Sequence, residues 1–350
     1  MAKKDFYIRE SELDDFQRHL LLRNLDESMV VSGCAGSGKS IIALHKARQI
    51  QQEKGDDYEV IVFTKSLCNY MNSGKEALDL NNDFDYHWSW KNRRRSPKSD
   101  YIIVDEIQDF TKEEIEEFKN SARKYFYFFG DTAQSIFDGL KPTQSIRDIA
   151  YQASVSEFPL YFNYRLPKPV AKITEDYIGV DTSYKDATYK SNVDTIPRII
   201  QYANFEKQLE AIARIIKTRK LIDVGIFFPR GIEVKNASEI LTNLGVNNEV
   251  RYNDKVDWTK SKNTLNFDTS NPKLMTYHSA KGLQFETVFL PSCNIENNIE
   301  GFSKQKSLYV AMTRTYNNLY ILHSGDLSSF FDRVPVNLYK TTEYDEIQDI

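Results

Sequence analysis

A glycine-rich segment between an apolar run and a helical pattern constrains this chain most. The segment follows the apolar residues 29–31, opens a helical pattern that continues to residue 54, and has the spacing G-x-x-x-x-G-K-S. That spacing, between a strand and a helix, is typical of a phosphate-binding P-loop. Its residues are Gly33, Cys34, Ala35, Gly36, Ser37, Gly38, Lys39 and Ser40. Backbone N–H groups and the helix N-terminus both attract anions there, so the segment predicts binding of a nucleoside triphosphate.

Two side chains of the loop have chemical roles. Lys39 is expected to reach the β- and γ-phosphates, and the Ser40 hydroxyl is expected to bind Mg²⁺. A glycine-rich turn without any ligand is the alternative interpretation. It leaves the Lys-Ser pair at this offset unexplained, so we favour the nucleotide site.

An acidic pair follows another apolar run. Residues 101–104 are Tyr-Ile-Ile-Val, and Asp105 and Glu106 come directly after them. We expect Asp105 to hold Mg²⁺ and Glu106 to accept a proton from the attacking water, which makes the reaction ATP hydrolysis. An isolated Asp-Glu pair is usually a solvated surface feature. Its place after a strand and downstream of a P-loop favours the catalytic interpretation.

Alternating strand and helix patterns predict an α/β fold with parallel sheets flanked by helices. Strands are expected at residues 29–31, 59–63, 101–104 and 125–129, and in a second series at 196–202, 223–228, 273–277, 287–290 and 319–322. Helices are expected at residues 40–54, 112–123 and 205–220. We therefore predict one domain over residues 1–160, a second over 161–335 and an acidic tail over 336–350.

Composition adds limits to the partner and the compartment. The 46 Lys and Arg residues against 50 Asp and Glu give a net charge of -4, so a nucleic acid would need local basic patches. The three cysteines are scattered and odd in number, which predicts reduced thiols rather than a disulfide framework. No apolar run approaches the roughly 18 residues of a membrane span, so we expect a cytoplasmic protein without a membrane partner.

These motifs together resemble superfamily 1 helicases of the UvrD/Rep type, in that family's order along the chain. The first half supplies four such blocks, at residues 13–17, 61–66, 105–109 and 130–136. The resemblance implies that Gln17 hydrogen-bonds adenine, that residues 61–66 contact a single strand, and that Gln134 senses the γ-phosphate. It also implies two RecA-like domains.

The second half supplies three further blocks, at residues 163–165, 276–285 and 309–314. The resemblance implies that Tyr164 stacks on adenine and that Gln284, at a position where a Glu is usual, bonds the ribose. Arg165 and Arg314 would both approach the γ-phosphate, Arg314 as an arginine finger. ATP would then lie in a cleft between the two domains, and its hydrolysis would drive opening and closing of that cleft.

The chain departs from the family in two ways that concern strand separation. Larger relatives carry accessory domains before Asp105 and before His278, where this chain has room for neither. Asp138 and Gly139 also stand where an Arg-Trp pair usually provides a base-stacking surface. Stacking contributes roughly 1 to 3 kcal/mol per base, so unwinding by the usual route is in question.

A replacement surface for a single strand is predicted where aromatic residues lie beside a basic run, at residues 86–95. A solvated loop with packed tryptophans is the alternative for that segment, and we expect His87 to be a packing residue. The full set of candidate nucleic-acid contacts is Phe63, Thr64, Lys65, Trp88, Trp90, Arg93, Arg94, Thr276 and His278.

Three functions remain as hypotheses. The first is an ATP-driven translocase or helicase on single-stranded nucleic acid, DNA rather than RNA. The second is an ATP-controlled switch or regulatory subunit that signals to an effector or nuclease partner without separating strands. The third, a P-loop kinase, leaves Glu106, Gln134 and the two arginines unexplained, so we disfavour it.

Overall fold

A computed structural model of the chain describes residues 9–55, 57–73, 75–93, 97–136, 142–179, 188–253, 261–294 and 304–344. Arg94, Asp138 and Gly139 lie outside the described residues. In the part of the chain that the structure describes, no helix is both long and apolar enough to span a bilayer.

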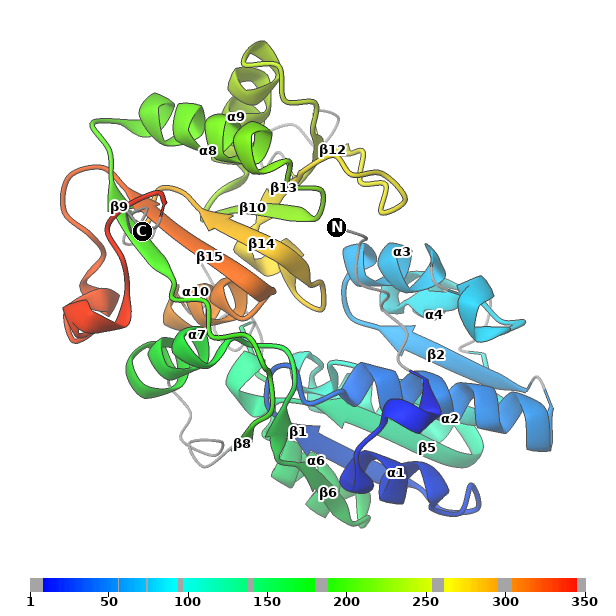
Figure 1. Ribbon diagram of the computed structural model, residues 1–350. Helices are drawn as coiled ribbons and strands as arrows, with labels where there is room; N and C mark the ends of the chain where they lie inside the picture. Colours follow the sequence, from blue (N-terminus) through cyan, green and yellow to red (C-terminus); the bar gives the residue numbers. More distant parts are fainter. Residues whose placement is uncertain are drawn as a thin grey trace.

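The first half of the chain forms a parallel sheet (Figure 1). Its six described strands lie in the order β3-β2-β4-β5-β1-β6. Their bounds are β1 Met29–Gly33, β2 Tyr58–Val62, β3 Phe84–Tyr86, β4 Ser99–Val104, β5 Ala122–Gly130 and β6 Glu157–Leu160. The chain moves from β1 outward to β3 and then returns through β4 and β5 to β6 on the far side of β1. A crevice at the carboxyl end of β1 and β5 is therefore the expected ligand site.

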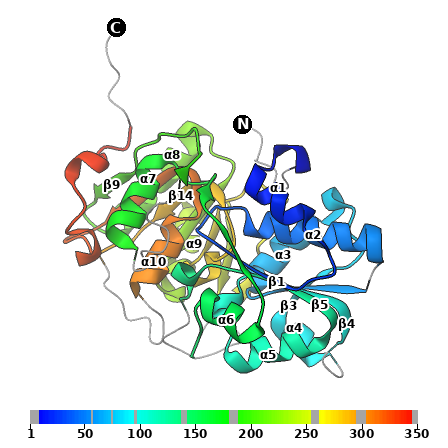
Figure 2. The same ribbon diagram turned by 90° about the horizontal axis from the view of Figure 1, so that it is seen from below.

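Alternation along the central strands explains why helices cover both faces of this sheet. Val30 and Ile102 belong to one apolar cluster, whereas Val31 and Ile103 belong to another. Successive strand residues point to opposite faces, so strands that are apolar at every position need a cover on each side. Figure 2 shows α1 and α2 on one side of the sheet and α5 and α6 on the other. The helices are α1 Asp15–Leu22, α2 Lys39–Lys54, α3 Lys65–Ser73, α4 His87–Asn92, α5 Lys112–Ser121 and α6 Ile146–Ala153.

The second half forms a sheet whose seven described strands lie in the order β12-β11-β13-β10-β14-β15-β9. All neighbours are parallel except β11 and β12. The strands are β9 Arg198–Gln201, β10 Val224–Phe228, β11 Glu249–Tyr252, β12 Lys262–Asn263, β13 Lys273–Thr276, β14 Phe285–Leu290 and β15 Thr315–His323. The pair β7 Phe162–Asn163 and β8 Thr188–Tyr189 forms a small ribbon between the two sheets in sequence.

Helices cover both faces of the second sheet as well. The described α-helices of the second half are α7 Lys168–Ile173, α8 Phe205–Arg219, α9 Gly231–Asn243 and α10 Lys304–Met312. The apolar residues of α8 and α9 share a cluster with one face of the sheet. Residues of α10 join the other face in a cluster that continues into α2 and the first sheet. The two sheets therefore share one continuous apolar core.

The predicted α/β class is confirmed, and each predicted strand and helix is found with shifts of a few residues at its ends. The structure adds elements that the sequence did not indicate, among them β3, β6, β11, α9 and α10. β3 has only three residues and β11 only four, so neither gives a pattern long enough to stand out in the sequence. All three cysteines are buried and free of disulfides, as predicted.

Candidate functional site

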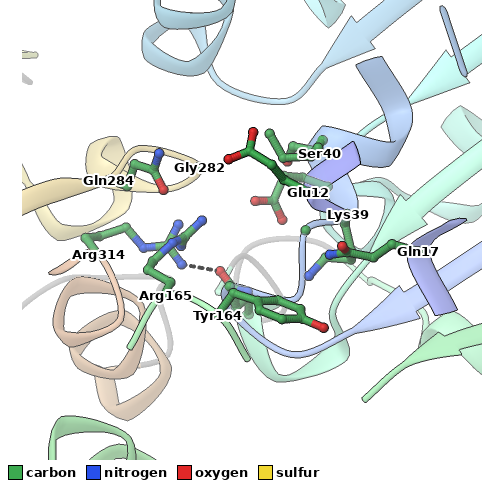
Figure 3. A pocket seen from close by; sticks show the side chains of 14 residues that line it. Glu12, Gln17, Lys39, Ser40, Tyr164, Arg165, Gly282, Gln284 and Arg314 are labelled. Atoms are coloured by element: carbon green, nitrogen blue, oxygen red, sulfur yellow. Dashed lines mark hydrogen bonds between the residues drawn. The ribbon is translucent and has the colours of Figure 1, made fainter. Parts of the chain in front are cut away.

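A cavity lies where the carboxyl ends of the first sheet face the second sheet (Figure 3). It holds about 960 Å³ of empty space, part of which is open to solvent. Its lining comes from both halves of the chain: Glu12, Gln17, Gly36, Gly38, Lys39, Ser40, Ile41, Glu106, Gln134, Tyr164, Arg165, Gly282, Gln284 and Arg314.

The predicted P-loop connects β1 to α2 at the floor of this cavity. Gly36 and Gly38 have φ values of 78° and 90°, a region that residues with side chains rarely adopt. A Cβ atom at Gly36 would also lie 2.6 Å from the Cβ of Arg165, so the loop passes very close to the second half. The Lys39 ammonium donates to the carbonyl oxygens of Gly33, at 2.8 Å, and Cys34, at 3.0 Å. The Lys39 ammonium is therefore held against the backbone of the P-loop itself.

The first carboxylate of the acidic pair contacts the P-loop serine. The Ser40 hydroxyl donates to Asp105 Oδ2 at 2.5 Å, although the two residues are 65 positions apart in sequence. Asp105 is almost fully buried, and burial, followed by the neighbouring charge of Glu106, raises its pKa to about 6. Two hard oxygen donors are therefore held side by side at the start of α2.

The second carboxylate has an unusual backbone conformation. Glu106 has φ 58° and ψ 40°, which costs of order 1–3 kcal/mol for a residue with a side chain. Its carboxylate accepts a 2.5 Å hydrogen bond from the Gln108 amide. Burial by itself would raise the pKa of Glu106, but the positive charges of Lys281, Lys39 and Arg314 outweigh it, so the pKa is lowered. Glu106 is therefore held ionised at the edge of the cavity.

A hydrogen-bond network joins the end of β5 to the second half. The Gln134 amide donates to Asp131 Oδ2 at 2.6 Å, and the Gln134 Oε1 accepts from the Arg314 guanidinium. Arg314 is also held within its own half of the chain, because its Nε donates to Val310 O at 2.9 Å. Arg314 follows α10 and is only 2% exposed, so its guanidinium is buried where it contacts Gln134 of the first half. Gln134 therefore connects the P-loop half with the second half.

Two more buried cations, Lys281 and Arg165, lie near Glu106. Lys281 is fully buried, and its ammonium contacts Asp109 Oδ2 and the Gln134 carbonyl, with Glu106 Oε2 at 3.7 Å. Arg165 donates to Thr313 O at 3.5 Å. Burial, and then the charge of Arg314, lowers the pKa of Arg165 to about 10. Three positive side chains thus converge on one acidic edge.

The residues expected at the nucleoside, Gln17 and Tyr164 at the adenine and Gln284 at the ribose, also lie at this cavity. Asp14 caps α1, accepting from the Gln17 N–H at 2.9 Å, and the Gln17 amide donates to Ser37 O at 3.0 Å. The Tyr164 hydroxyl donates to Asp14, and Gln284 is hydrogen-bonded to Tyr70. All three expected residues, Gln17, Tyr164 and Gln284, therefore line the same cavity.

The predicted nucleic-acid residues divide by exposure. Trp88 is 51% exposed, Lys65 and Arg93 are exposed, and His278 is half-buried. Arg93 forms ion pairs with Glu59 and Asp85. Thr64 and Thr276 are buried, with their hydroxyls in local hydrogen bonds.

Two of those predictions need correction. Trp90 is 1% exposed and packs on Phe118, with ring centroids 5.1 Å apart. Phe63 is buried between His87 and Phe110, at 5.0 Å from each ring. Both side chains belong to the apolar cores, so neither can stack on a base. The expectation that His87 is a packing residue is confirmed.

The sequence analysis assigned no role to Lys281, Asp131 or Glu12. Lys281 lies inside the 276–285 block, so its position was visible but its partners were not. Asp131 follows β5 as Asp105 follows β4, and that shared position at a strand end is the signal that could have indicated it.

A P-loop, an acidic strand end and cations from a second sheet define a helicase-type nucleoside triphosphate hydrolase of superfamily 1. The chain belongs to the family of the viral superfamily 1 RNA helicase core domain, whose model matches residues 29–216 and 230–323.

Individual proteins are similar at low identity. A protein of Acanthamoeba polyphaga mimivirus named "Putative ATP-dependent DNA helicase" is 23% identical, over 97% of this chain and 48% of its own length. The chain thus spans about half the length of that curated relative. The arterivirus nonstructural protein 10 helicase matches 91% of this chain and 63% of its own, with 16% identity and a TM-score of 0.47. The C-terminal domain of a possible DNA helicase from Lactobacillus plantarum matches 51% of this chain and 98% of its own, with 19% identity and a TM-score of 0.37.

Proposed function

We propose that this chain hydrolyses ATP between its two sheets and uses the cycle to move along single-stranded nucleic acid, with DNA preferred over RNA. The observation that carries the proposal is the contact of Arg314 with Gln134. It joins a cation of the second half to a residue after the end of β5, beside the P-loop. A change at the γ-phosphate site would therefore alter the contact that sets the relative position of the two sheets.

The chemistry assigned to these residues is in-line attack by water on the γ-phosphorus, which breaks its bond to the β,γ-bridging oxygen and releases ADP and inorganic phosphate. Glu106 accepts the proton of that water, and its lowered pKa keeps it ionised for this role. Lys39, Arg165 and Arg314 stabilise charge on the transferring phosphoryl group, and an arginine finger alone contributes about 10³ to 10⁵ in rate. Ser40 and Asp105 would hold Mg²⁺, which keeps most of its other positions for water and phosphate oxygens and would neutralise phosphate charge.

We also propose a compact UvrD/Rep-like core without accessory domains. Residues 1–160 would form the ATP-binding domain, 161–335 the second RecA-like domain, and 336–350 a tail. All six strands of the first described sheet lie between residues 29 and 160, and all seven of the second between 198 and 323. Where an accessory domain would precede Asp105, the described residues form only α3, a 3-10 turn, β3 and α4.

The preference for DNA has the weaker support. It agrees with the name of the mimivirus relative, whereas the family model is described for RNA helicases.

The test is ATP turnover at low salt with no nucleic acid, with single-stranded DNA and with single-stranded RNA of the same sequence. We expect stimulation by single strands, more by DNA, and loss of turnover in Lys39→Ala and Glu106→Gln. Turnover that no single strand stimulates would overturn the translocase.

A second candidate is an ATP-controlled switch that acts on an effector or nuclease partner. The short segment of α3, β3 and α4 favours it, because little structure is present to separate strands. A strand-displacement assay distinguishes the two functions. Normal ATP turnover without displacement, restored by an added partner, would select the switch.

A further inference from the structure

Arg251 on β11 points toward the first half of the molecule. Along a strand, residues two apart share a face, so Arg251 lies on the face of Glu249. Its register partner on β13 is Met275, which belongs to the apolar core shared by both sheets. Tyr86 of β3 lies near enough to Arg251 to interact with it electrostatically. The guanidinium is therefore placed at the junction of the two halves.

The second half contacts the first beside this position. Glu249 accepts from the Asn266 N–H at 2.6 Å and so holds the segment that follows β12. In that segment, the ring of Phe267 lies 5.1 Å from the ring of Tyr70 on α3, in an edge-to-face contact. Figure 1 shows the β12 edge of the second sheet facing α3 and α4 of the first. Arg251 thus belongs to a surface that both halves build.

The charge of Arg251 is not compensated within the described part of the chain. Its Nη1 atom is buried and has no hydrogen-bond partner there, and no described carboxylate forms an ion pair with it. Burial lowers its pKa, and Tyr86 opposes this only in part. The Arg251 side chain as a whole is half-buried, and a partly buried cation without a counter-charge favours the binding of an anion. By contrast, Arg93 has two carboxylate partners.

The aromatic groups that adjoin Tyr86 suit a nucleotide chain better than a small anion. Tyr86 is half-buried, and His87 connects it to the exposed ring of Trp88 through centroid distances of 4.7 and 5.4 Å. Lys65, at the start of α3, is exposed. Aromatic faces beside cations bind bases and phosphates together, with little regard to sequence.

We propose that Arg251 binds a backbone phosphate of a single strand that crosses between the two halves, with Tyr86 and Trp88 on the base side. This rests on the proposed function above. It adds a phosphate-binding position from the second half, so that the strand would bridge two bodies whose spacing the nucleotide controls.

The test is binding of a fluorescein-labelled oligothymidylate by Arg251→Met at several salt concentrations. Removing one phosphate contact should weaken binding about tenfold at low salt and reduce the slope of log K against log salt by about one. Arg251→Lys should keep most of the slope, because a charge remains. The matched control is Arg333→Met, since Arg333 is exposed on the second half after β15. Circular dichroism verifies that each variant is folded.

The aromatic side has its own pair of variants. Trp88→Ala should weaken binding about tenfold without changing the salt slope, because a stacking contact releases no counterion. Tyr151→Ala is its control, as Tyr151 is 86% exposed on α6. Wild-type protein that binds no single strand would refute the proposed function. Wild-type binding with Arg251→Met equal to Arg333→Met would refute this inference alone.

Discussion

Lys281 and Arg251 are both cations that the second sheet places against the first, yet their surroundings are opposite. Lys281 contacts Asp109 and the Gln134 carbonyl, with Glu106 nearby. Arg251 faces Tyr86 and has no carboxylate among the described residues. Lys281 therefore joins the two halves beside the cavity through contacts that satisfy its charge. Arg251 lacks such a partner among the described residues, which suits the binding of an anion.

Lys46 of α2 gives a third case, in which neutral groups satisfy a buried ammonium. It donates to Leu21 O at 2.8 Å and Arg23 O at 2.7 Å. Burial lowers its pKa to about 8, and the charges of Glu53 and Glu27 offset that effect only in part. Comparing the three cations teaches that burial alone does not define a role, and that the partner does.

The largest expected effect is on catalysis by the cations around Glu106. Arg314→Ala removes a charge that would stabilise the transferring phosphoryl group, so turnover should fall by about 10³ to 10⁵. Stopped-flow binding of a fluorescent ATP analogue should show that the nucleotide still binds. Arg214→Ala is the control, because Arg214 pairs with Glu343 away from the cavity. A loss of less than tenfold would contradict the assigned role of Arg314.

The next effect is on stability. Lys281→Met leaves Asp109 buried without its cation, which should cost about 3–5 kcal/mol in the free energy of unfolding. Adding Asp109→Asn should recover part of that loss, since no orphaned carboxylate remains. Urea unfolding of the single and double variants measures both values. Equal stability of Lys281→Met and wild type would show that the contact between Lys281 and Asp109 is not a stabilising one.

The third effect depends on pH. Because the pKa of Lys46 is lowered from 10.5 to about 8, the unfolded chain binds more protons between these values. Stability should therefore rise with pH over that range, by up to about 3 kcal/mol at 1.36 kcal/mol per pKa unit. Lys46→Met lacks this titration, so the difference between its urea midpoint and that of wild type should change with pH. If the difference between the two urea midpoints is the same from pH 7 to pH 11, burial does not lower the pKa of Lys46.

The smallest effect is expected at Arg251. Arg251→Met removes a charge that has no ion-pair partner among the described residues, so the free energy of unfolding should change by less than about 1 kcal/mol or increase. Replacement by Met should therefore destabilise the protein at Lys281 but not at Arg251. A large destabilisation by Arg251→Met would mean that Arg251 is structural and would remove the distinction from Lys281.

Local patterns predicted where the P-loop and the acidic pair lie relative to the strands and helices. The helix opened by the P-loop begins at Lys39, and Asp105 follows β4 as the strand pattern indicated. Both depend on residues adjacent in sequence. The pairing of Lys281 with Asp109 spans 172 positions, and no local pattern carries it.

Within the aromatic and basic run at residues 86–95, the prediction was wrong for Trp90, and the reason is geometric. α4 places Trp88 and Trp90 two residues apart, which is about 200° around a helix, so one ring faces solvent and the other the core. Composition could not decide between them, because the helix had not been predicted. Charge pairing was equally hidden, since Arg93 is neutralised by Glu59 from β2 and Asp85 from β3.

The most direct test is whether the nucleotide and the single strand share the junction between the sheets. The measurement is the affinity of Glu106→Gln for a labelled single strand, without nucleotide and with saturating ATP and Mg²⁺. We predict a change of at least about fivefold, matched by an equal effect of the strand on ATP affinity, as linkage requires. Strand affinity that is the same with and without ATP would contradict the account.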